Sequence, residues 1–378
     1  MSFSQPITES HLYKELGEIP YYISKIYGYD SYIDDYYDPY NRHSSFFRQV
    51  HLLRYPSQSK INYLKKIFRI LLNAKKIDLL YLLQITPDSL LKMLAYRIGG
   101  GTGKIYLKLD LGLYEKNGKD LLVWNNMNFF LRSFHMLFKN LPSIYTVETK
   151  DSYNRLLGSY YQSLVNQKKL YLMPNGFDSE ILSELNIVKL PVSEKQNIIL
   201  TVGRIGTYQK NTELLLDILS RVNLKGWKVY IVGAIDKIFI NNIESFYSQF
   251  PDKKDSVIFT GEISQRELYN YYNISRVFLL TSRHESYAFV LAEAAYMNNY
   301  IISTNVGIAP ELLDYAAGHI VENNLSESFV NEIQRIINLS SQDLNQLIPH
   351  NGKQNIDMIT WDWILKNNAG ILKLIDKS

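Results

Sequence analysis

Apolar residues along the chain recur at two spacings, which predict alternating strands and helices. Short apolar runs typical of buried strands lie at residues 79–84, 105–109, 143–147, 170–173, 197–202, 228–232, 257–259, 278–280 and 301–303. Stretches with apolar residues three and four positions apart, typical of amphipathic helices, lie between them, as at residues 212–221 and 265–273. This alternation predicts an α/β fold whose second half is a parallel, doubly wound sheet.

The first half of the chain follows this pattern less regularly. We expect a helix beginning near Pro20, strands at residues 29–33 and 51–55, and a helix at residues 60–76. The last of these segments carries six lysines and arginines and no acidic residue. Its apolar stripe is expected to pack on the sheet. Its bases are either solvated or in contact with an anionic membrane surface, for which the candidates are Lys60, Lys65, Lys66 and Arg69.

Length and composition limit the class of protein. The 378 residues suggest two domains. We find neither an apolar run of about 18 residues nor a basic leader followed by an apolar stretch, so we expect no membrane-spanning helix and no signal peptide. The absence of cysteine excludes disulfides and thiolate metal sites and fits a cytoplasmic protein. The net charge of +4 is too small to indicate nucleic-acid binding.

The most informative stretch runs from Phe278 to Glu293. It reads as a short strand, a polar turn, and a helix that opens near Ala288. The mouth of a helix exposes N–H groups and the positive end of the dipole, so it attracts anions such as phosphate. Glu285 stands in the turn beside it and Glu293 follows eight residues later. A carboxylate next to a phosphate site suggests a partner that carries hydroxyls, as a sugar does, although two glutamates alone are better explained as solvated charges.

A second set of polar residues follows the strand at residues 197–202. Gly203 allows a tight turn beside a ligand, and Arg204 and Lys210 come directly after it. Arginine offers a fork to two oxygens and lysine a mobile charge, so this pair is suited to a diphosphate without help from a metal. The run of glycines at residues 99–104 follows a helix and opens a strand, whereas a phosphate-binding loop follows a strand and opens a helix. We therefore interpret that run as a flexible turn.

These pieces, in this order, resemble the retaining glycosyltransferases of the GT-B fold, the large group with sucrose synthase and glycogen-synthase-like enzymes (glycosyltransferase family 4 type). The matching features are Pro174-Asn175-Gly176, Arg204 with Lys210, Gly261-Glu262, Glu285-x7-Glu293 and residues 305–311. The resemblance covers residues 169–322 well and the first half loosely. It implies two Rossmann-like domains facing across a cleft, at residues 1–175 and 176–355, with a terminal helix at residues 356–378 crossing back to the first domain.

The resemblance also implies roles in the second domain. Glu285 contacts the sugar hydroxyls and Glu293 the ribose of a nucleotide-diphosphate sugar, while Arg204 and Lys210 bind the diphosphate. Gly261 and Glu262 lie near the base. The N–H groups of Ala288, Phe289 and Val290 point at the diphosphate, and the donor site also includes Gly203 and Ser282. Ser286 and Ala288 depart from the family because glycines are commonest at these two positions.

In the first domain the resemblance implies two further residues. Gly17 matches a position that approaches the donor phosphate, although a plain turn before a helix explains it equally well. Asp110 stands at the end of a strand where many relatives have a histidine, and it could bind a sugar hydroxyl, accept the proton of the acceptor, or be structural. Lys108 lies on the same face of that strand and is a candidate partner of Asp110.

The implied activity is transfer of a sugar, with retention of configuration, from a nucleotide donor to a carbohydrate, lipid-linked or protein acceptor. The implied setting is assembly of bacterial surface polysaccharide, glycolipid or glycoprotein, with no metal and no cofactor. The alternative is a catalytically inactive protein of the same fold that binds glycans or stabilises a partner. The presence of Glu285, Glu293, Arg204 and Lys210 argues against that alternative.

Overall fold

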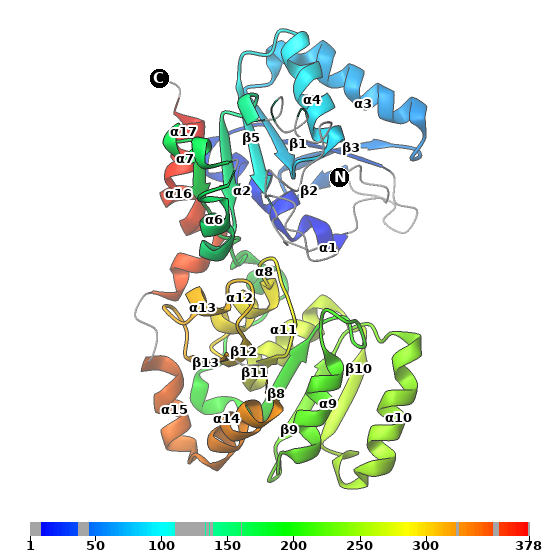
Figure 1. Cartoon of the computed structure of the whole chain (residues 1–378), viewed down its shortest axis with the longest axis vertical. Coiled ribbons are helices and arrows are strands. Elements are labelled where there is room, and N and C mark those ends of the chain that lie inside the picture. Colours follow the sequence, from blue (N-terminus) through cyan, green and yellow to red (C-terminus); the bar gives the residue numbers. More distant parts are fainter. Residues whose placement is uncertain are drawn as a thin grey trace. The chain divides into compact units, whose positions relative to one another are not determined.

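The structure is a computed structural model that describes residues 9–36, 45–109, 139–159, 161–322, 325–350 and 355–376, together with residues 133 and 136. The chain divides into two compact units (Figure 1). Unit 1 comprises Met1–Asp178 and Trp361–Ser378, and unit 2 comprises Ser179–Thr360. The unit boundaries therefore lie after residues 178 and 360, where the sequence suggested 175 and 355. Within the described ranges, no helix is both long and apolar enough to cross a bilayer.

Unit 1 is built on a parallel sheet of four strands in the order β4-β5-β6-β7. The strands are β4 (Leu79–Leu83), β5 (Lys104–Leu109), β6 (Ile144–Val147) and β7 (Leu170–Leu172). The accompanying helices are α3 (Lys60–Asn73), α4 (Pro87–Ile98), α6 (Lys150–Leu156) and α7 (Gln162–Asn166), and a short 3-10 turn, η1 (Ala74–Lys76), continues α3. The central strands β5 and β6 are almost wholly buried, which explains why both read as continuous apolar runs.

A second, smaller sheet completes unit 1. Its strands are β1 (Tyr32–Tyr36), β3 (Val50–Tyr55) and β2 (Phe46–Phe47), with β1 parallel and β2 antiparallel to β3. The first of these strands begins at Tyr32, three residues later than its predicted start at Tyr29. Two helices precede this sheet in the chain, α1 (Glu9–Leu12) and α2 (Glu15–Tyr27).

Helix α2 begins at Glu15, so the prediction of a start near Pro20 is wrong and Pro20 lies inside the helix. Gly17 falls in the first turn and is buried. A Cβ atom on Gly17 would lie 2.2 Å from the carbonyl oxygen of Leu12, so the glycine is needed for close packing of α1 against α2. Its neighbour Glu18 is fully buried and forms an ion pair of 3.1 Å with Arg48.

Helix α3 buries only part of its predicted apolar stripe, because Ile67 and Leu71 pack on the core of unit 1 and the other apolar side chains of the stripe do not. Its buried positions include Asn62, Lys66 and Ile70, while four apolar side chains are exposed to solvent: Ile61, Leu64, Phe68 and Leu72. The prediction that the apolar stripe packs on the sheet is therefore wrong for these four residues. The polar residues can be buried because they have partners, since Asn62 donates to the carbonyl of Ser57 at 2.9 Å.

Unit 2 contains one parallel sheet of six strands in the order β10-β9-β8-β11-β12-β13. The strands are β8 (Gln196–Val202), β9 (Lys228–Val232), β10 (Val257–Gly261), β11 (Ser275–Leu280), β12 (Tyr300–Thr304) and β13 (Gly318–Val321). The α-helices of the unit are α8 (Glu180–Glu184), α9 (Thr212–Arg221), α10 (Ile240–Gln249), α11 (Gln265–Ile274), α12 (Phe289–Tyr296), α13 (Ala309–Leu312), α14 (Ser326–Asn338) and α15 (Ser341–His350). Short 3-10 turns are η3 (Val192–Glu194), η4 (Lys237–Phe239), η5 (Pro251–Lys253) and η6 (Ile356–Ile359). The predicted doubly wound pattern is thus confirmed.

The end of the chain forms two helices, α16 (Trp361–Asn367) and α17 (Ala369–Ile375), where one was expected. Both belong to unit 1. The N–H of Trp361 donates to the carbonyl of Phe177 at 3.0 Å, and the hydroxyl of Tyr27 donates to the carbonyl of Leu365 at 2.7 Å. Trp361 is buried, whereas Trp363 is partly exposed.

Candidate functional site

The order of strands in unit 2 marks the place where a ligand is expected. From β8 the chain proceeds outward through β9 and β10 to one edge of the sheet, then returns to β11 beside β8 and proceeds through β12 and β13 to the other edge. In open parallel sheets, ligands bind at the carboxyl ends of the strands where the winding direction reverses. The loops after β8 and β11 are the ones that carry Arg204, Lys210 and Glu285.

These two loops are joined by an ion pair. The Nζ of Lys210 lies 2.6 Å from Oε1 of Glu285, and both side chains are mostly buried. The hydroxyl of Ser282 donates to the same carboxylate oxygen at 2.7 Å. Ser282 is fully buried, so the structure places its hydroxyl against Glu285, where it orients the carboxylate.

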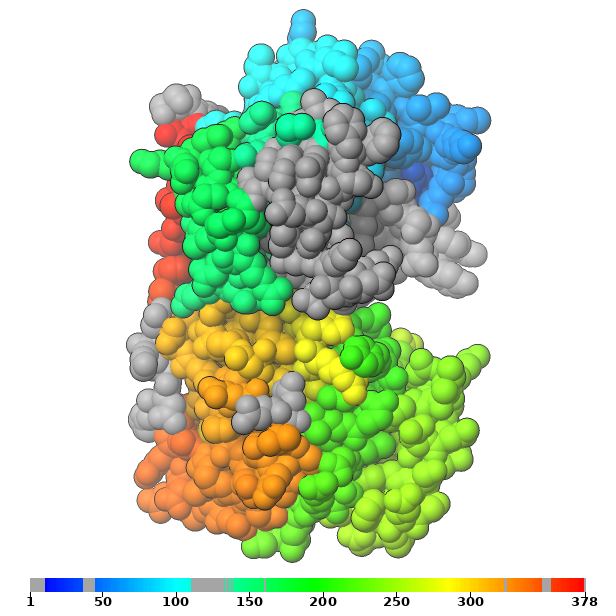
Figure 2. All heavy atoms as spheres, in the orientation of Figure 1, coloured from blue at the N-terminus to red at the C-terminus, as the bar shows by residue number. Residues whose placement is uncertain are grey.

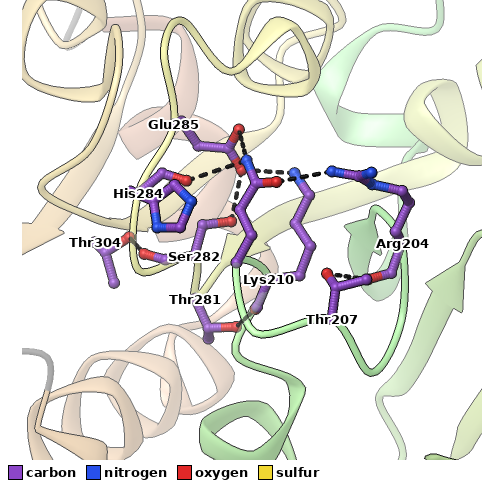
Figure 3. A network of polar contacts seen from close by, with 9 residues as sticks. Arg204, Thr207, Lys210, Thr281, Ser282, His284, Glu285 and Thr304 are labelled. Atoms are coloured by element: carbon purple, nitrogen blue, oxygen red, sulfur yellow. Dashed lines mark hydrogen bonds and ion pairs between the residues drawn. The ribbon is translucent and has the colours of Figure 1, made fainter. Parts of the chain in front are cut away.

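Gln209 connects Arg204 to this pair. Figure 3 shows Arg204, Lys210 and Glu285 in the resulting network of polar contacts. Its Oε1 accepts a hydrogen bond of 2.8 Å from Nη2 of Arg204. Its Nε2 donates to Oε2 of Glu285 at 3.1 Å and to the carbonyl of His284 at 3.3 Å. The three predicted site residues Arg204, Lys210 and Glu285 are therefore brought together, with the amide of Gln209 as the bridge between the arginine and the carboxylate.

Backbone contacts hold the two loops in register. The N–H of Arg283 donates to the carbonyl of Gln209 at 2.8 Å, and the hydroxyl of Thr281 donates to the carbonyl of Lys210 at 3.2 Å. The hydroxyl of Thr304, at the end of β12, donates to the carbonyl of Ser282 at 2.7 Å. These contacts hold the charged groups in place at the carboxyl ends of the central strands.

Three glycines end three neighbouring strands beside these charges. Gly203 follows β8, Gly233 follows β9 and Gly261 ends β10. A Cβ on Gly203 would lie 2.9 Å from Cε of Lys210, and a Cβ on Gly233 would lie 2.0 Å from the carbonyl oxygen of Gly203. The backbone therefore carries no side chains at the carboxyl ends of these three strands. Glu262, which follows Gly261, is exposed to solvent.

The mouth of helix α12 has an unusual backbone. Ala288 occupies the N-cap position with φ 71° and ψ 67°, in the left-handed region that favours glycine. The loop after β12 packs against this turn, because Ile308 donates its N–H to the carbonyl of Tyr287 at 2.8 Å. Gly307 lies so close that a Cβ would be 2.4 Å from the carbonyl oxygen of Tyr287. Phe289 and Val290 form the first turn of the helix, as predicted from the sequence.

Glu293, one turn further into α12, is held by a residue that sequence reasoning missed. The hydroxyl of Tyr272 on α11 donates to Oε2 of Glu293 at 2.7 Å. Burial, and then the carboxylate of Glu293, raise the pKa of Tyr272 well above its ordinary value. The phenol therefore stays protonated and keeps donating over the physiological pH range.

The predicted residues of unit 1 have different outcomes. Asp110 lies outside the described residues. Lys108 is fully buried, and its Nζ lies 3.5 Å from Oε1 of Glu148, with which it forms an ion pair. The predicted pairing of Lys108 with Asp110 stays a prediction. Gly17 has the packing role given above, and its approach to a donor phosphate stays a prediction.

The chemical capacity of the unit 2 site follows from its groups. Two cations, a helix mouth and a bare backbone edge suit an anion such as a diphosphate, and a carboxylate beside them suits a ligand that carries hydroxyls. In the described ranges, no group of three or more histidines or carboxylates has the arrangement of a metal site. Gln209 and Tyr272 gave no signal in the sequence because an uncharged residue in a turn and a tyrosine on a helix are common everywhere.

Comparison with known families places this site in a recognised domain. Residues 183–354 match the family model described as Glycosyl transferases group 1. Among curated proteins, the chain is 29% identical over 216 residues to the amylovoran biosynthesis glycosyltransferase AmsD of Erwinia amylovora. That match covers 57% of this chain and 59% of AmsD, so the chain matches less than two thirds of this relative's length.

Solved structures show the same fold over nearly the whole chain. A glycosyltransferase from Rickettsia africae ESF-5 superposes with a TM-score of 0.67 at 16% identity, covering 96% of this chain and 94% of the other. Anabaena HepE, solved in complex with UDP and glucose, gives a TM-score of 0.58 at 15% identity, covering 95% and 93%. The predicted fold class, α/β with two Rossmann-like domains of the GT-B type, is thus confirmed.

Proposed function

From the premise that unit 2 carries a Glycosyl transferases group 1 domain, we propose that the chain transfers a sugar, with retention of configuration, from a nucleotide-diphosphate sugar to an acceptor hydroxyl. The observation that carries the proposal is the network that joins Arg204, Lys210 and Glu285 where the sheet reverses its winding. AmsD, which acts in amylovoran biosynthesis by its name, supports a role in assembling bacterial surface polysaccharide.

The leaving group is the part of the reaction that the site is best suited to stabilise. When the bond between the anomeric carbon and the phosphate oxygen breaks, its electron pair goes to that oxygen, and the diphosphate gains negative charge. Arg204, Lys210 and the N-terminus of α12 would neutralise this charge as it develops. Two cations and a helix mouth can do this without a metal, so we propose a metal-independent enzyme of the family 4 type that needs no other cofactor.

Glu285 would bind the sugar through its hydroxyl groups. The carboxylate is already oriented by Ser282, Gln209 and Lys210, which is the pre-organisation expected of a group that accepts hydrogen bonds from sugar hydroxyls. Binding of the diphosphate to Lys210 would weaken the ion pair and release acceptor capacity on Glu285 for the sugar. Glu293, oriented by Tyr272, would accept from the ribose, and Gly261 with Glu262 would lie near the base.

Retention fits an attack on the face from which the diphosphate departs. The acceptor hydroxyl would form the new bond to the anomeric carbon, and its proton would go to the departing phosphate oxygen. A double displacement would need Glu285 to attack from the opposite face, and a carboxylate already held by three donors is a poor nucleophile. In unit 1, Asp110 and Gly17 remain our candidates for contacts with acceptor and donor.

Nucleotide sugars should first be screened by the rise in thermal unfolding midpoint, since a bound donor stabilises the folded state. Release of the nucleoside diphosphate should then be measured for the wild-type chain and for the double variant Arg204→Ala, Lys210→Ala. We expect at least a thousandfold lower turnover in the variant, as for loss of a group that stabilises developing charge. The matched control is Arg221→Ala, Lys225→Ala, which removes two exposed bases elsewhere on unit 2.

Two results would contradict the proposal. Turnover of the Arg204, Lys210 double variant at the wild-type rate would remove the cations from the mechanism. Donor binding without any release of nucleoside diphosphate, in the presence of mixed acceptors, would instead favour the inactive glycan-binding or partner-stabilising protein.

A further inference from the structure

The exposed face of α3 is the largest departure from the expected burial of apolar side chains. Ile61 is 67% exposed, Leu64 52%, Phe68 59% and Leu72 77%. At about 100° per residue these four positions span an arc of roughly 80°, so they form one continuous stripe along the helix. We call these four residues the α3 stripe. A single exposed apolar residue is ordinary, whereas a helical row of four marks a surface that contacts something apolar.

The orientation of α3 is fixed by specific contacts on its other side. The Nζ of Lys66 lies 3.6 Å from the ring centroid of Tyr36 and 3.4 Å from the carbonyl oxygen of Asp34. Asn62 donates to the carbonyl of Ser57 at 2.9 Å. Turning the helix to bury the stripe would expose Ile70 and break these contacts, so the stripe faces outward for structural reasons.

Lysines border the stripe. Lys60, Lys65, Lys75 and Lys76 are all exposed, and residues 60–77 contain no aspartate or glutamate. Arg69, a predicted membrane contact, instead pairs with Asp34 at 3.7 Å, and Lys66 is buried, so these two candidates are withdrawn. The surface that remains has an apolar centre with exposed lysines on the same segment, and the exposed Asp78 lies just beyond its end.

Helix α4 extends the apolar surface at one end. Its last residue, Ile98, is 76% exposed. The next residue, Gly99, packs so tightly on the end of α3 that a Cβ would lie 2.1 Å from the carbonyl oxygen of Leu71. The two helices adjoin in unit 1 (Figure 1), and residues of this part of the chain, in blue, lie at its surface (Figure 2).

We propose that the α3 stripe and its bordering lysines bind the surface of an anionic lipid bilayer. The apolar side chains would enter the boundary between headgroups and acyl chains while the lysines contact lipid phosphates, as in interfacial helices. A second copy of the chain fits less well. A symmetric dimer would place this basic border against itself, and like charges would repel across the interface.

Binding to vesicles tests this inference. Co-sedimentation should be measured with vesicles of phosphatidylglycerol and phosphatidylcholine in equal parts, and with phosphatidylcholine alone, at low and at high ionic strength. We expect at least roughly tenfold tighter binding to the anionic vesicles, weakened by salt. The apolar variant Leu64→Ser, Phe68→Ser and the charge variant Lys60→Glu, Lys65→Glu should each lower this binding roughly tenfold or more.

Matched controls lie on unit 2. Val188→Ser, Ile238→Ser changes two apolar residues that are 84% and 85% exposed, and Lys237→Glu, Lys254→Glu reverses two exposed lysines. Both controls should bind as the wild type does. If the apolar variant fails to fold, the charge variant decides, because Lys60 and Lys65 are exposed surface residues.

Three results would overturn the inference: equal binding to neutral and anionic vesicles, wild-type binding by the charge variant, or a dimer in solution that the apolar variant converts to monomer. The last result would assign the stripe to a second copy of the chain. The inference rests on unit 1 alone. A chain that transfers sugar but ignores vesicles would therefore refute it and leave the proposed function intact.

Discussion

Both units carry a lysine–glutamate pair near the carboxyl ends of their parallel strands, and the two pairs are built differently. In unit 2, Lys210 and Glu285 are 2.6 Å apart, and the carboxylate also accepts from Gln209 and Ser282. The side chains keep 15% and 9% of their surface exposed. In unit 1, Lys108 and Glu148 are 3.5 Å apart and only 0% and 3% exposed.

In the unit 1 pair, the ammonium group of Lys108 lacks hydrogen bonds within the described part of the chain, whereas Glu148 accepts a bond of 2.8 Å from Asn175. A buried charge with few hydrogen bonds depends on its counter-ion, whereas a partly exposed pair can exchange its partner for a ligand. The comparison indicates that a charged pair at the carboxyl ends of parallel strands marks a ligand site only where solvent and ligand can reach both side chains.

The largest effect is expected from Lys210→Met in unit 2. Loss of the cation should reduce turnover about a thousandfold, because developing charge on the diphosphate loses a partner. The free energy of unfolding, measured with urea, should fall much less than for loss of Lys108 in unit 1, because Glu285 keeps the hydrogen bonds from Gln209 and Ser282. A variant that unfolds readily instead would show that Lys210 is chiefly structural, and the comparison would fail.

The opposite outcome is expected for Lys108→Met in unit 1. The substitution leaves Glu148 buried without its cation, so we expect a loss of about 3 kcal/mol in the free energy of unfolding. The double variant Lys108→Met, Glu148→Gln removes both charges and should recover more than half of that loss. Equal stability of the single and double variants in urea titrations would contradict the description of this pair as mutually dependent.

Lys66 is another buried lysine of unit 1, with an aromatic partner and nearby carboxylates, and it allows a test by pH. Burial lowers the pKa of Lys66 to about 8, although the carboxylates of Asp34, Asp35 and Asp88 oppose the shift. Between that pH and the ordinary pKa of about 10.4, the unfolded chain binds more protons than the folded one. The contribution of Lys66 to the free energy of unfolding should therefore rise with pH over that range.

The measurement compares the wild type with Lys66→Met. From pH 8 to pH 10, the free energy of unfolding of the wild type should gain about 2 kcal/mol relative to the variant. Below pH 8 the difference should be constant. A flat difference over the whole range would mean that the ring of Tyr36 keeps the ammonium charged in the folded chain.

The smallest effect is expected from changes to Gln209, which contacts the Lys210–Glu285 pair of unit 2. Gln209→Leu keeps the size of the side chain and removes the bridge from Arg204 to Glu285. We expect kcat/KM to fall about tenfold, the value of one hydrogen bond to a charged group, with little change in stability. Gln209→Glu is the informative companion, because it restores an acceptor for Arg204 and repels Glu285. Wild-type kinetics in both variants would show that the bridge does not orient the site.

The sequence was sufficient to predict most of the strands, though not β2 or β13, and the winding of unit 2. It also predicted that Arg204, Lys210 and Glu285 meet, because residues that follow neighbouring parallel strands lie at the same end of the sheet. The side of α3 that faces the core could not be predicted in the same way. Helical spacing indicates that a stripe exists, but its direction depends on Lys66 meeting Tyr36 and Asp34, whose positions are distant in sequence.

The partners of individual charges were also beyond the sequence. The sequence offered Asp110 as a partner of Lys108 because alternate residues of a strand share a face, but it did not indicate Glu148, which follows the neighbouring strand β6 and pairs with Lys108. Gln209 and Tyr272 were missed because their importance comes only from the groups that they touch. The start of α2 was predicted too late because proline favours the first turn of a helix, whereas Pro20 lies within this one.

The three glycines at the strand ends constrain any attempt to change the proposed choice of sugar donor. At Gly233 no side chain has room, because a methyl group would meet the carbonyl of Gly203 at 2.0 Å. At Gly261 the space is open, but its φ of 70° admits chiefly asparagine or aspartate. A mutant library aimed at donor choice should therefore leave position 233 untouched, sample few residues at 261, and place its diversity on the exposed rim at Tyr208 and Glu262.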